Sequence, residues 1–232
     1  MPLMDFRTMR FLRIPTTLAS VAFALGMGTT CGNLRGDVPL SITVRTAKGE
    51  AVADAAFALI PLDSKLPAAP AVSRAHGEVV QQKEEFIPYV TVVQAGTHVE
   101  FPNRDSVQHH VYSLSKAKKF ELPLYDPGRS ESLVFDVSGT VTLGCNIHDW
   151  MIAYVIVVPT PYFAKTSAEG TATVSAPPGR YRAELLHPRL SKPVSEEIVL
   201  KEGDAATRAF TISLKPDRRI RRHSDSKSGG YP

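Results

Sequence analysis

The stretch GTVTLGCNIHDWMIAYVIVV, residues 139–158, decides the fold of this chain. Its two ends, Gly139–Leu143 and Ile152–Val158, are rich in Val, Ile, Thr and Tyr and predict two β-strands. The loop between them carries a thiol, an imidazole and a thioether at positions i, i+3 and i+6: Cys145, His148 and Met151. A continuous strand would point the first two to opposite faces, whereas a tight loop can direct all three at one point. The stretch therefore predicts a hairpin whose loop presents three donor groups to one site.

The first 28 residues have the pattern of an export signal. Three arginines precede an apolar run, Leu18–Met27, and small residues close it at Gly26 and Gly28. The run is shorter than the roughly 20 residues of a membrane span. We therefore expect a cleaved signal peptide over residues 1–28, with an uncleaved anchor as the alternative. The mature chain is then periplasmic or secreted and has no transmembrane span.

Export makes the use of cysteine informative. Cys31 lies at the signal junction, which leaves Cys145 without an obvious disulfide partner in an oxidising compartment. An exported thiol of this kind needs protection, either by burial as a small apolar side chain or by binding a metal. Thiolate, imidazole and thioether together are the donors of copper sites that cycle between Cu(I) and Cu(II), whereas a structural zinc site has little use for a thioether. The combination favours copper over zinc and over a buried cysteine.

A further imidazole comes from PNRDSVQHHV, residues 102–111, where an Asn and Asp turn precedes two histidines that begin a strand. This pattern resembles the first-histidine region of plastocyanins and amicyanins. The Cys-x-x-His-x-x-Met of residues 145–151 resembles their ligand loop, with the short amicyanin-type spacing. The resemblance covers residues 75–158 and implies a cupredoxin domain with one type 1 (blue) copper. In the order of that family, the equatorial ligands would be His109, Cys145 and His148, and the weak axial ligand would be Met151.

Neighbouring side chains each have two interpretations. His109 and His110 point to opposite faces of a strand, so only one of them can face the metal; alternation alone does not choose, and the resemblance assigns His109. Trp150 and Tyr154 either shield the copper from water or pack the core. Asn103 either holds a ligand loop by hydrogen bonds or caps a turn. The two remaining candidates have no ligand partners nearby in sequence, and we interpret them as structural: His98 and His187.

Short runs with strand composition recur along the whole mature chain between Gly, Pro, Asp and Asn breaks, and no long run has a helical period. The predicted fold class is all-β, with a cupredoxin Greek-key sandwich over residues 75–158. The flanks, residues 38–66 and 159–216, resemble the two halves of a smaller carboxypeptidase-regulatory-like, transthyretin-type β-sandwich into which the cupredoxin block is inserted. The alternative is that both flanks add strands to one enlarged cupredoxin. The pattern gives no strand between Ser113 and Leu133.

The positive charge of the chain is concentrated at its ends. The sequence pI is about 9.1, but residues 1–28 hold three Arg against one Asp, and residues 217–232 hold four Arg and one Lys against two Asp. The rest of the chain is close to neutral and carries no basic stripe for phosphate contacts, so nucleic acid is not an expected partner. Residues 217–232 are expected to be a disordered basic tail.

The function that these features predict is one-electron transfer by a type 1 copper protein that exchanges electrons with redox protein partners. We do not expect an enzyme, because the chain has no Gly-rich nucleotide loop, nucleophile elbow or zinc-protease motif, and four protein ligands leave no position for substrate. The alternative is a copper-binding structural or storage protein that uses the transthyretin-like module as an interaction scaffold. A cluster of lysines either docks an acidic partner or is a solvated hairpin: Lys116, Lys118 and Lys119.

Overall fold

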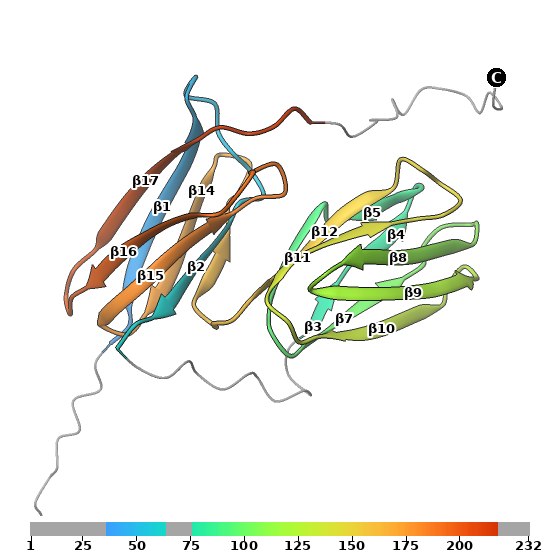
Figure 1. Cartoon of the computed structure of the whole chain (residues 1–232), viewed down its shortest axis with the longest axis horizontal. Helices are drawn as coiled ribbons and strands as arrows, with labels where there is room; N and C mark the ends of the chain where they lie inside the picture. The colour runs from blue at the N-terminus through green and yellow to red at the C-terminus, as the bar shows by residue number, and fades with distance from the viewer. Residues whose placement is uncertain (1–35, 64–75, 218–232) are drawn as a thin grey trace, which may run out of the picture. The chain divides into compact units, whose positions relative to one another are not determined.

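A computed structural model describes residues 36–63 and 76–217. All of its regular elements are β-strands, which confirms the all-β prediction (Figure 1). Within the described residues no helix is long and apolar enough to cross a membrane. The predicted signal peptide, residues 64–75, and all but the first residue of the predicted basic tail lie outside this range.

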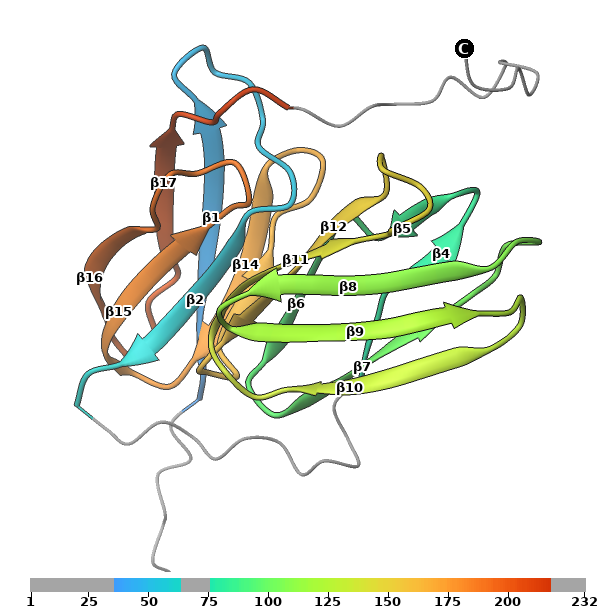
Figure 2. The ribbon, with the colours of Figure 1, turned by 45° about the vertical axis from the view of Figure 1, so that its right-hand side comes forward.

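Ten strands between residues 76 and 158 build a central sandwich. They are β3 (His76–Glu78), β4 (Val80–Gln82), β5 (Glu85–Ile87), β6 (Val90–Gln94), β7 (Thr97–Pro102), β8 (His109–Ser115), β9 (Lys118–Tyr125), β10 (Ser130–Phe135), β11 (Gly139–Gly144) and β12 (Ile152–Val158). One sheet has the order β6-β12-β11-β8-β9, a second has the order β10-β7-β3, and β4 and β5 form a separate hairpin. Figure 2 shows β8 and β9 side by side.

The core of this sandwich follows from period-2 alternation along its strands. In β7 the fully buried Val99 and Phe101 alternate with outward residues, and in β11 Val141 and Leu143 do the same. These side chains join one apolar cluster that also contains Cys145 and Met151. The predicted ligand loop therefore starts and ends inside the core, which fixes both of its ends.

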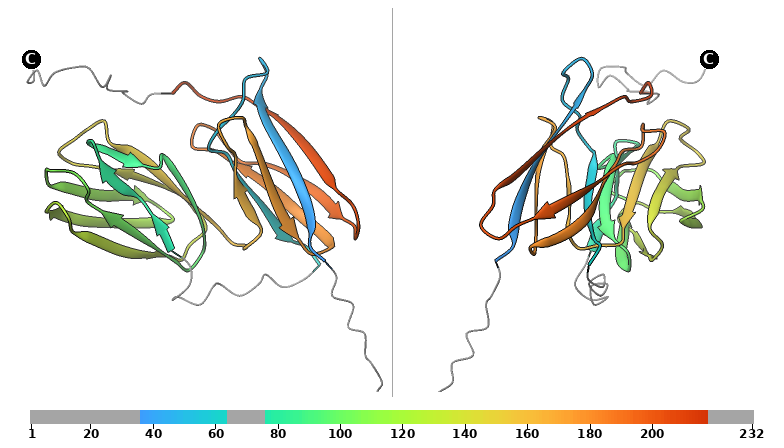
Figure 3. Two further views of the ribbon diagram at one scale, coloured as in Figure 1. Left: turned by 180° about the vertical axis from the view of Figure 1, so that it is seen from behind. Right: turned by 60° about the vertical axis from the view of Figure 1, so that its left-hand side comes forward.

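Seven flanking strands form a second sandwich: β1 (Val38–Thr46), β2 (Ala56–Pro61), β13 (Phe163–Lys165), β14 (Thr171–Ala176), β15 (Gly179–Leu186), β16 (Val194–Leu200) and β17 (Ala206–Ile212). Its sheets have the orders β14-β1-β17 and β13-β2-β15-β16, and Figure 3 shows β1 lying between β14 and β17. Strands β1 and β2 thus pair with strands that follow β12 in the chain. That pairing is the one expected of a sandwich interrupted by an inserted block. The resemblance of the flanking sandwich to the transthyretin type stays a prediction.

Strands β2 and β12 are buried on both faces, unlike the half-buried strands that alternation predicts. Phe57 of β2 faces the core of the flanking sandwich, whereas its neighbours Ala56 and Ala58 belong to a third cluster with Ile156 and Val158 of β12. The small alanine side chains leave room for this second layer of contacts. These strands therefore read as continuous apolar runs in the sequence.

The structure contains one long strand that the sequence pattern missed. Strand β9 pairs with β8 along most of its length and lies at the edge of its sheet. Its lysines and Pro123 weaken the strand signal, yet an edge strand tolerates both, because one side of its backbone makes no ladder bonds. The candidate strands read from the sequence therefore omitted β9, whereas the hairpin interpretation of the lysine cluster agrees with the pairing of Ser115 with Lys118.

Gly170 in the flanking sandwich packs closely against backbone atoms of Val44 and Val52. Its φ is +72°, and a Cβ at this position would lie 2.5 Å from the carbonyl oxygen of Val44 and 2.9 Å from the amide nitrogen of Val52. Gly203 provides a matched control, since its φ is +81° and nothing lies within 4 Å of the same position. We expect Gly203→Ala to lower the free energy of unfolding by about 1 kcal/mol, from left-handed backbone strain alone. Gly170→Ala should cost about 3 kcal/mol or more, because the clash is with backbone atoms that cannot rotate away.

Urea denaturation of the two variants and the parent protein measures this difference. Equal losses for Gly170→Ala and Gly203→Ala would show that the contacts at Gly170 relax freely.

Candidate metal centre

The loop between β11 and β12 folds back on itself at the ligand motif. The backbone N–H of Met151 donates to the carbonyl of His148 at 3.0 Å, and the Sγ of Cys145 lies 3.7 Å from Nδ1 of His148. Cys145 and Met151 are almost fully buried, and His148 is half-buried. The tight loop predicted from the spacing is therefore present, and the thiol and one imidazole face each other across it.

His109, the first residue of β8, completes the group. One donor atom from each of His109, Cys145 and His148 lies within 4.8 Å of the others, and no other such group of His, Cys, Asp or Glu occurs within the described residues. The rings of His109 and His148 have centroids 4.9 Å apart. Residues that are 36 positions or more apart in the sequence thus meet at one end of the central sandwich.

The two ring nitrogens of His109 have different surroundings. Its Nε2 lies 2.8 Å from Oδ2 of Asp105, whereas its Nδ1 is buried and has no hydrogen-bond partner among the described residues. The side chain is fully buried. Nδ1 of His110 and Nε2 of His98 are also buried without a partner among the described residues, so the neighbouring thiol and second imidazole are what distinguish His109. An unpaired imidazole nitrogen beside a thiol and a second imidazole is therefore a candidate metal donor.

His110 points to the other side of β8, as strand alternation requires. Its Nε2 lies 2.9 Å from Oε1 of Glu121 on β9, and it does not belong to the three-residue group. Of the two neighbouring histidines that the sequence left open, the structure brings His109 to the cysteine and pairs His110 with a carboxylate.

Met151 is buried in the same apolar cluster as Cys145. Both also line a surface hollow of about 460 Å³ beside Tyr112 and Gly144. The thioether thus shares the surroundings of the thiol, consistent with the donor set read from the sequence. Two imidazoles, one thiol and one thioether in a mostly apolar setting fit a soft or borderline metal such as copper.

Tyr125 is buried in the same apolar cluster as Cys145. Burial raises the pKa of this phenol to about 12, and its hydroxyl donates to the carbonyl of Phe101 at 2.8 Å while also meeting the side-chain amide of Gln81. A neutral, hydrogen-bonded phenol therefore stands within the cluster that contains Cys145. Low polarity around a thiolate strengthens its interactions with charged partners.

Asn103 holds the loop that leads to His109. Its side-chain N–H groups donate to the carbonyls of Val107 and Tyr125 at 2.8 and 3.2 Å, and its Oδ1 accepts from the backbone N–H of Asp105 at 3.0 Å. It is almost fully buried. Both interpretations made from the sequence are therefore correct at once: Asn103 caps the turn and fixes the loop that precedes the histidine.

The two aromatic candidates differ. Trp150 adjoins the site, with its ring 5.3 Å from that of His148 and its indole N–H donating to the carbonyl of Glu84 at 3.1 Å. Tyr154 instead packs edge-to-face on Tyr89, with ring centroids 5.3 Å apart, in the third apolar cluster. Only Trp150 is placed to shield the site.

Asp105 and the Lys83–Glu84 turn are the functional candidates that the sequence did not single out. Burial alone would raise the pKa of Asp105, but hydrogen bonds from the backbone of Glu84, from His109 and from the backbone of Lys83 lower it below its usual value. Asp105 is therefore an ionised carboxylate at neutral pH. The available signal was its place in the turn four residues before His109.

The remaining sequence candidates lie apart from the group. Nδ1 of His187 accepts from the backbone N–H of Arg189 at 3.0 Å, in keeping with a structural role, and His98 lies on β7 outside the three-residue group. Among the lysines, Lys118 pairs with Asp136 at 3.7 Å, while Lys116 and Lys119 are exposed. The charge cluster is therefore solvated, and its docking role stays a prediction.

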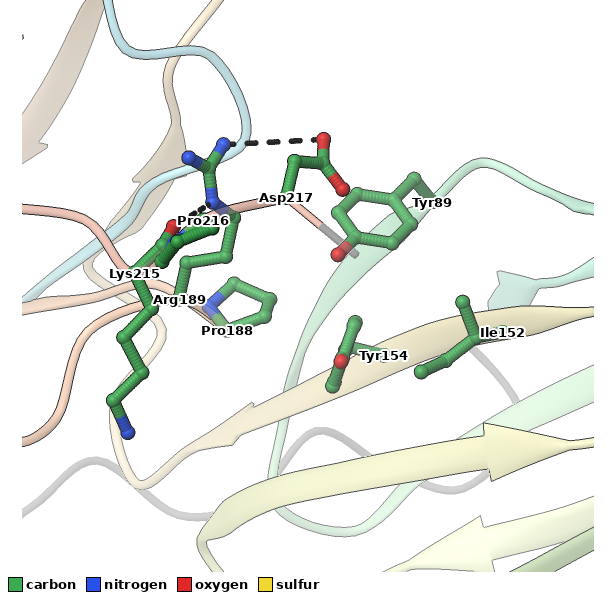
Figure 4. A pocket seen from close by; sticks show the side chains of 8 residues that line it. All are labelled: Tyr89, Ile152, Tyr154, Pro188, Arg189, Lys215, Pro216 and Asp217. Carbon is green, nitrogen blue, oxygen red and sulfur yellow. Dashed lines mark hydrogen bonds and ion pairs between the residues drawn. The ribbon is translucent and has the colours of Figure 1, made fainter. Parts of the chain in front are cut away.

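Figure 4 shows another hollow, of about 420 Å³, which contains no thiol or imidazole. Its wall combines two phenols with charged groups and prolines: Tyr89, Ile152, Tyr154, Pro188, Arg189, Lys215, Pro216 and Asp217. The guanidinium of Arg189 is held by the carbonyl of Lys215 at 2.6 Å and by the carboxylate of Asp217 at 3.9 Å. The hollow therefore lacks the donors that a soft metal requires.

No model of a known protein family matches this sequence, and no curated protein matches it. Among solved structures, a purple cupredoxin from Nitrosopumilus maritimus is 23% identical over 35% of this chain and 99% of its own, with a TM-score of 0.32. A Cu(I) form of an amicyanin mutant is 21% identical over 44% of this chain and 98% of its own, with a TM-score of 0.34. A Cu-containing nitrite reductase from Thermus scotoductus is 23% identical over 43% of this chain and 27% of its own, with a TM-score of 0.36.

Paired substitutions separate the two neighbouring histidines. His109→Ala removes a buried donor from the three-residue group, so we expect Cu(II) binding measured by competitive titration to weaken by at least 100-fold. His110→Ala removes only a side chain that faces Glu121 and should change the affinity by less than about threefold. The opposite pattern would move the first ligand to His110.

Proposed function

We propose that this chain is an exported type 1 copper protein of the cupredoxin class that carries single electrons. The observation that carries the proposal is the convergence of donor atoms from His109, Cys145 and His148 within 4.8 Å, with the buried Nδ1 of His109 left without a hydrogen-bond partner. In this proposal Met151 is the weak axial ligand. When bound, copper would supply one-electron chemistry by cycling between Cu(I) and Cu(II).

The protein's contribution is rigidity. His109 belongs to a paired strand, and Cys145 and Met151 sit at the two ends of a loop anchored in the core. Donors that cannot move offer the same surroundings to both oxidation states, so little rearrangement accompanies electron transfer. Burial of Cys145 to 4% exposure limits the access of oxidants to its sulfur.

A partner would approach the site on the side of His148. This imidazole is half-buried, whereas the side chains of His109, Cys145 and Met151 are almost fully buried. Ile147 next to it is 45% exposed and offers an apolar contact. We propose that redox protein partners in the periplasm or outside the cell exchange electrons through this surface, and that the flanking sandwich, of the carboxypeptidase-regulatory-like type, serves as a scaffold.

Copper titration of the purified chain tests the proposal. One equivalent of Cu(II) should produce strong absorption at about 600 nm, from charge transfer between thiolate and Cu(II). Cys145→Ser should abolish this band, because it removes the thiolate while it preserves size. Full colour in the Cys145→Ser variant would rule out the proposed site.

Met151 is tested by its effect on the potential. Met151→Gln should retain copper and lower the reduction potential, since a harder axial oxygen donor favours Cu(II) over Cu(I). Cyclic voltammetry of the variant and of the parent protein measures the shift. An unchanged potential would show that Met151 is not the axial ligand.

The rate of electron exchange, the release of copper to a chelator and the copper content per chain distinguish the proposed function from a storage or structural role and from an enzyme. A storage or structural role would give slow electron exchange and ready release of metal to a chelator. An enzyme would require a second metal site, which would appear as clearly more than one bound copper per chain.

A further inference from the structure

The carboxylate of Asp105 faces three donors. Oδ1 accepts from the backbone N–H of Lys83 at 2.5 Å, and Oδ2 accepts from the backbone N–H of Glu84 at 2.8 Å and lies 2.8 Å from Nε2 of His109. The side chain is 12% exposed. One carboxylate therefore connects a turn, a loop and the first residue of β8, although the turn lies more than 20 residues away along the chain.

The turn that Asp105 contacts is conformationally demanding. Lys83 and Glu84 join β4 to β5 as a two-residue hairpin loop, and both have left-handed backbones, with φ of 57° and 56°. Turns of this kind favour glycine and asparagine, because side chains on L-residues crowd the backbone there. The two N–H groups of this turn point at Asp105, so the carboxylate stabilises a conformation that its residue types disfavour.

The same turn also contacts the ligand loop. The carbonyl of Glu84 accepts from the indole N–H of Trp150, whose ring lies beside that of His148. The β4–β5 turn thus touches both sides of the site: His109 through Asp105, and the Cys145–Met151 loop through Trp150. In Figure 1 the β4–β5 turn, the start of β8 and the β11–β12 loop lie at the same end of the central sandwich.

Both oxygens of the Asp105 carboxylate accept from backbone N–H groups, those of Lys83 and Glu84, so the carboxylate acts as a hydrogen-bond acceptor at this position. The contact between Asp105 and His109 therefore requires the proton on Nε2, which leaves the lone pair of a neutral imidazole on Nδ1. That nitrogen is the buried atom without a partner in the three-residue group. The hydrogen bond on one side of the ring thus sets what the other side can bind.

We propose that Asp105 is a positioning residue that holds His109 in the Nε2–H tautomer and ties the β4–β5 turn to the metal centre, so that the site is arranged before any metal binds. The inference rests on the proposed function in that a metal is taken as the ligand of Nδ1. Asparagine cannot replace the carboxylate, because its single oxygen cannot accept from all three donors, and its amide would place N–H groups against an N–H.

The experiment uses the metal-free full chain labelled with ¹⁵N-histidine, in which long-range ¹H–¹⁵N spectra report the tautomer of each ring. The parent protein should show His109 with Nε2 protonated. Asp105→Asn should shift His109 to the Nδ1–H tautomer or to a mixture, and should weaken Cu(II) binding by about 10- to 100-fold. Asp126→Asn is the matched control, since Asp126 is exposed and its carboxylate accepts from the Gln108 side chain, at 2.7 Å. It should change neither the tautomer nor the affinity.

A parent protein with His109 protonated on Nδ1 overturns the inference without any variant, and so does an Asp105→Asn variant with the tautomer and affinity of the parent. These outcomes differ from failure of the proposed function. If the parent gives no blue absorption but Asp105→Asn still changes the tautomer, the copper assignment fails and the role of Asp105 stands.

Discussion

The site depends on one buried imidazole nitrogen that no protein group satisfies. Nδ1 of His109 is enclosed by the central sandwich, faces a thiol and a second imidazole, and makes no hydrogen bond among the described residues. A group that binds this nitrogen in the folded chain would stabilise the fold. Cys145 is under a similar constraint, because within the described residues it is a buried thiol that forms no disulfide, and a reactive thiol is protected either by burial or by a bound metal. A metal satisfies both residues at once.

The surrounding structure can be understood as support for that arrangement. Apolar strands bury the two ends of the ligand loop, Asn103 fixes the chain before His109, and the carboxylate of Asp105 lies within hydrogen-bond distance of Nε2 on the far side of the His109 ring. These contacts come from separate strands and loops, so no single hydrogen bond defines the geometry. Under the proposed function, a site arranged in this way before metal binding would change little between oxidation states, as electron transfer requires.

Much of this could be predicted from local sequence. The period-2 patterns of β1, β7 and β11 identified an all-β chain, and the spacing of Cys145, His148 and Met151 identified a loop of donors. Strand β9 was not among the predicted strands. Its lysines and Pro123 are acceptable only at a sheet edge, and the sequence of a single strand does not show whether it lies at an edge. Strands β2 and β12 departed from alternation for a related reason: both of their faces are covered by elements distant in sequence.

The sequence by itself determined the chemistry of the donors, their order along the chain and the strand class of the segments that carry them, because these depend on residue types and short-range periodicity. Only the tertiary structure decided that His109 and not His110 joins the cysteine, since both neighbours begin one strand with similar faces. Tertiary structure also brought Asp105 onto the backbone of Lys83 and Glu84, a contact across more than 20 residues. Hydrogen bonds between distant segments form only when strands pair and pack, and no local pattern encodes where a particular side chain then meets another.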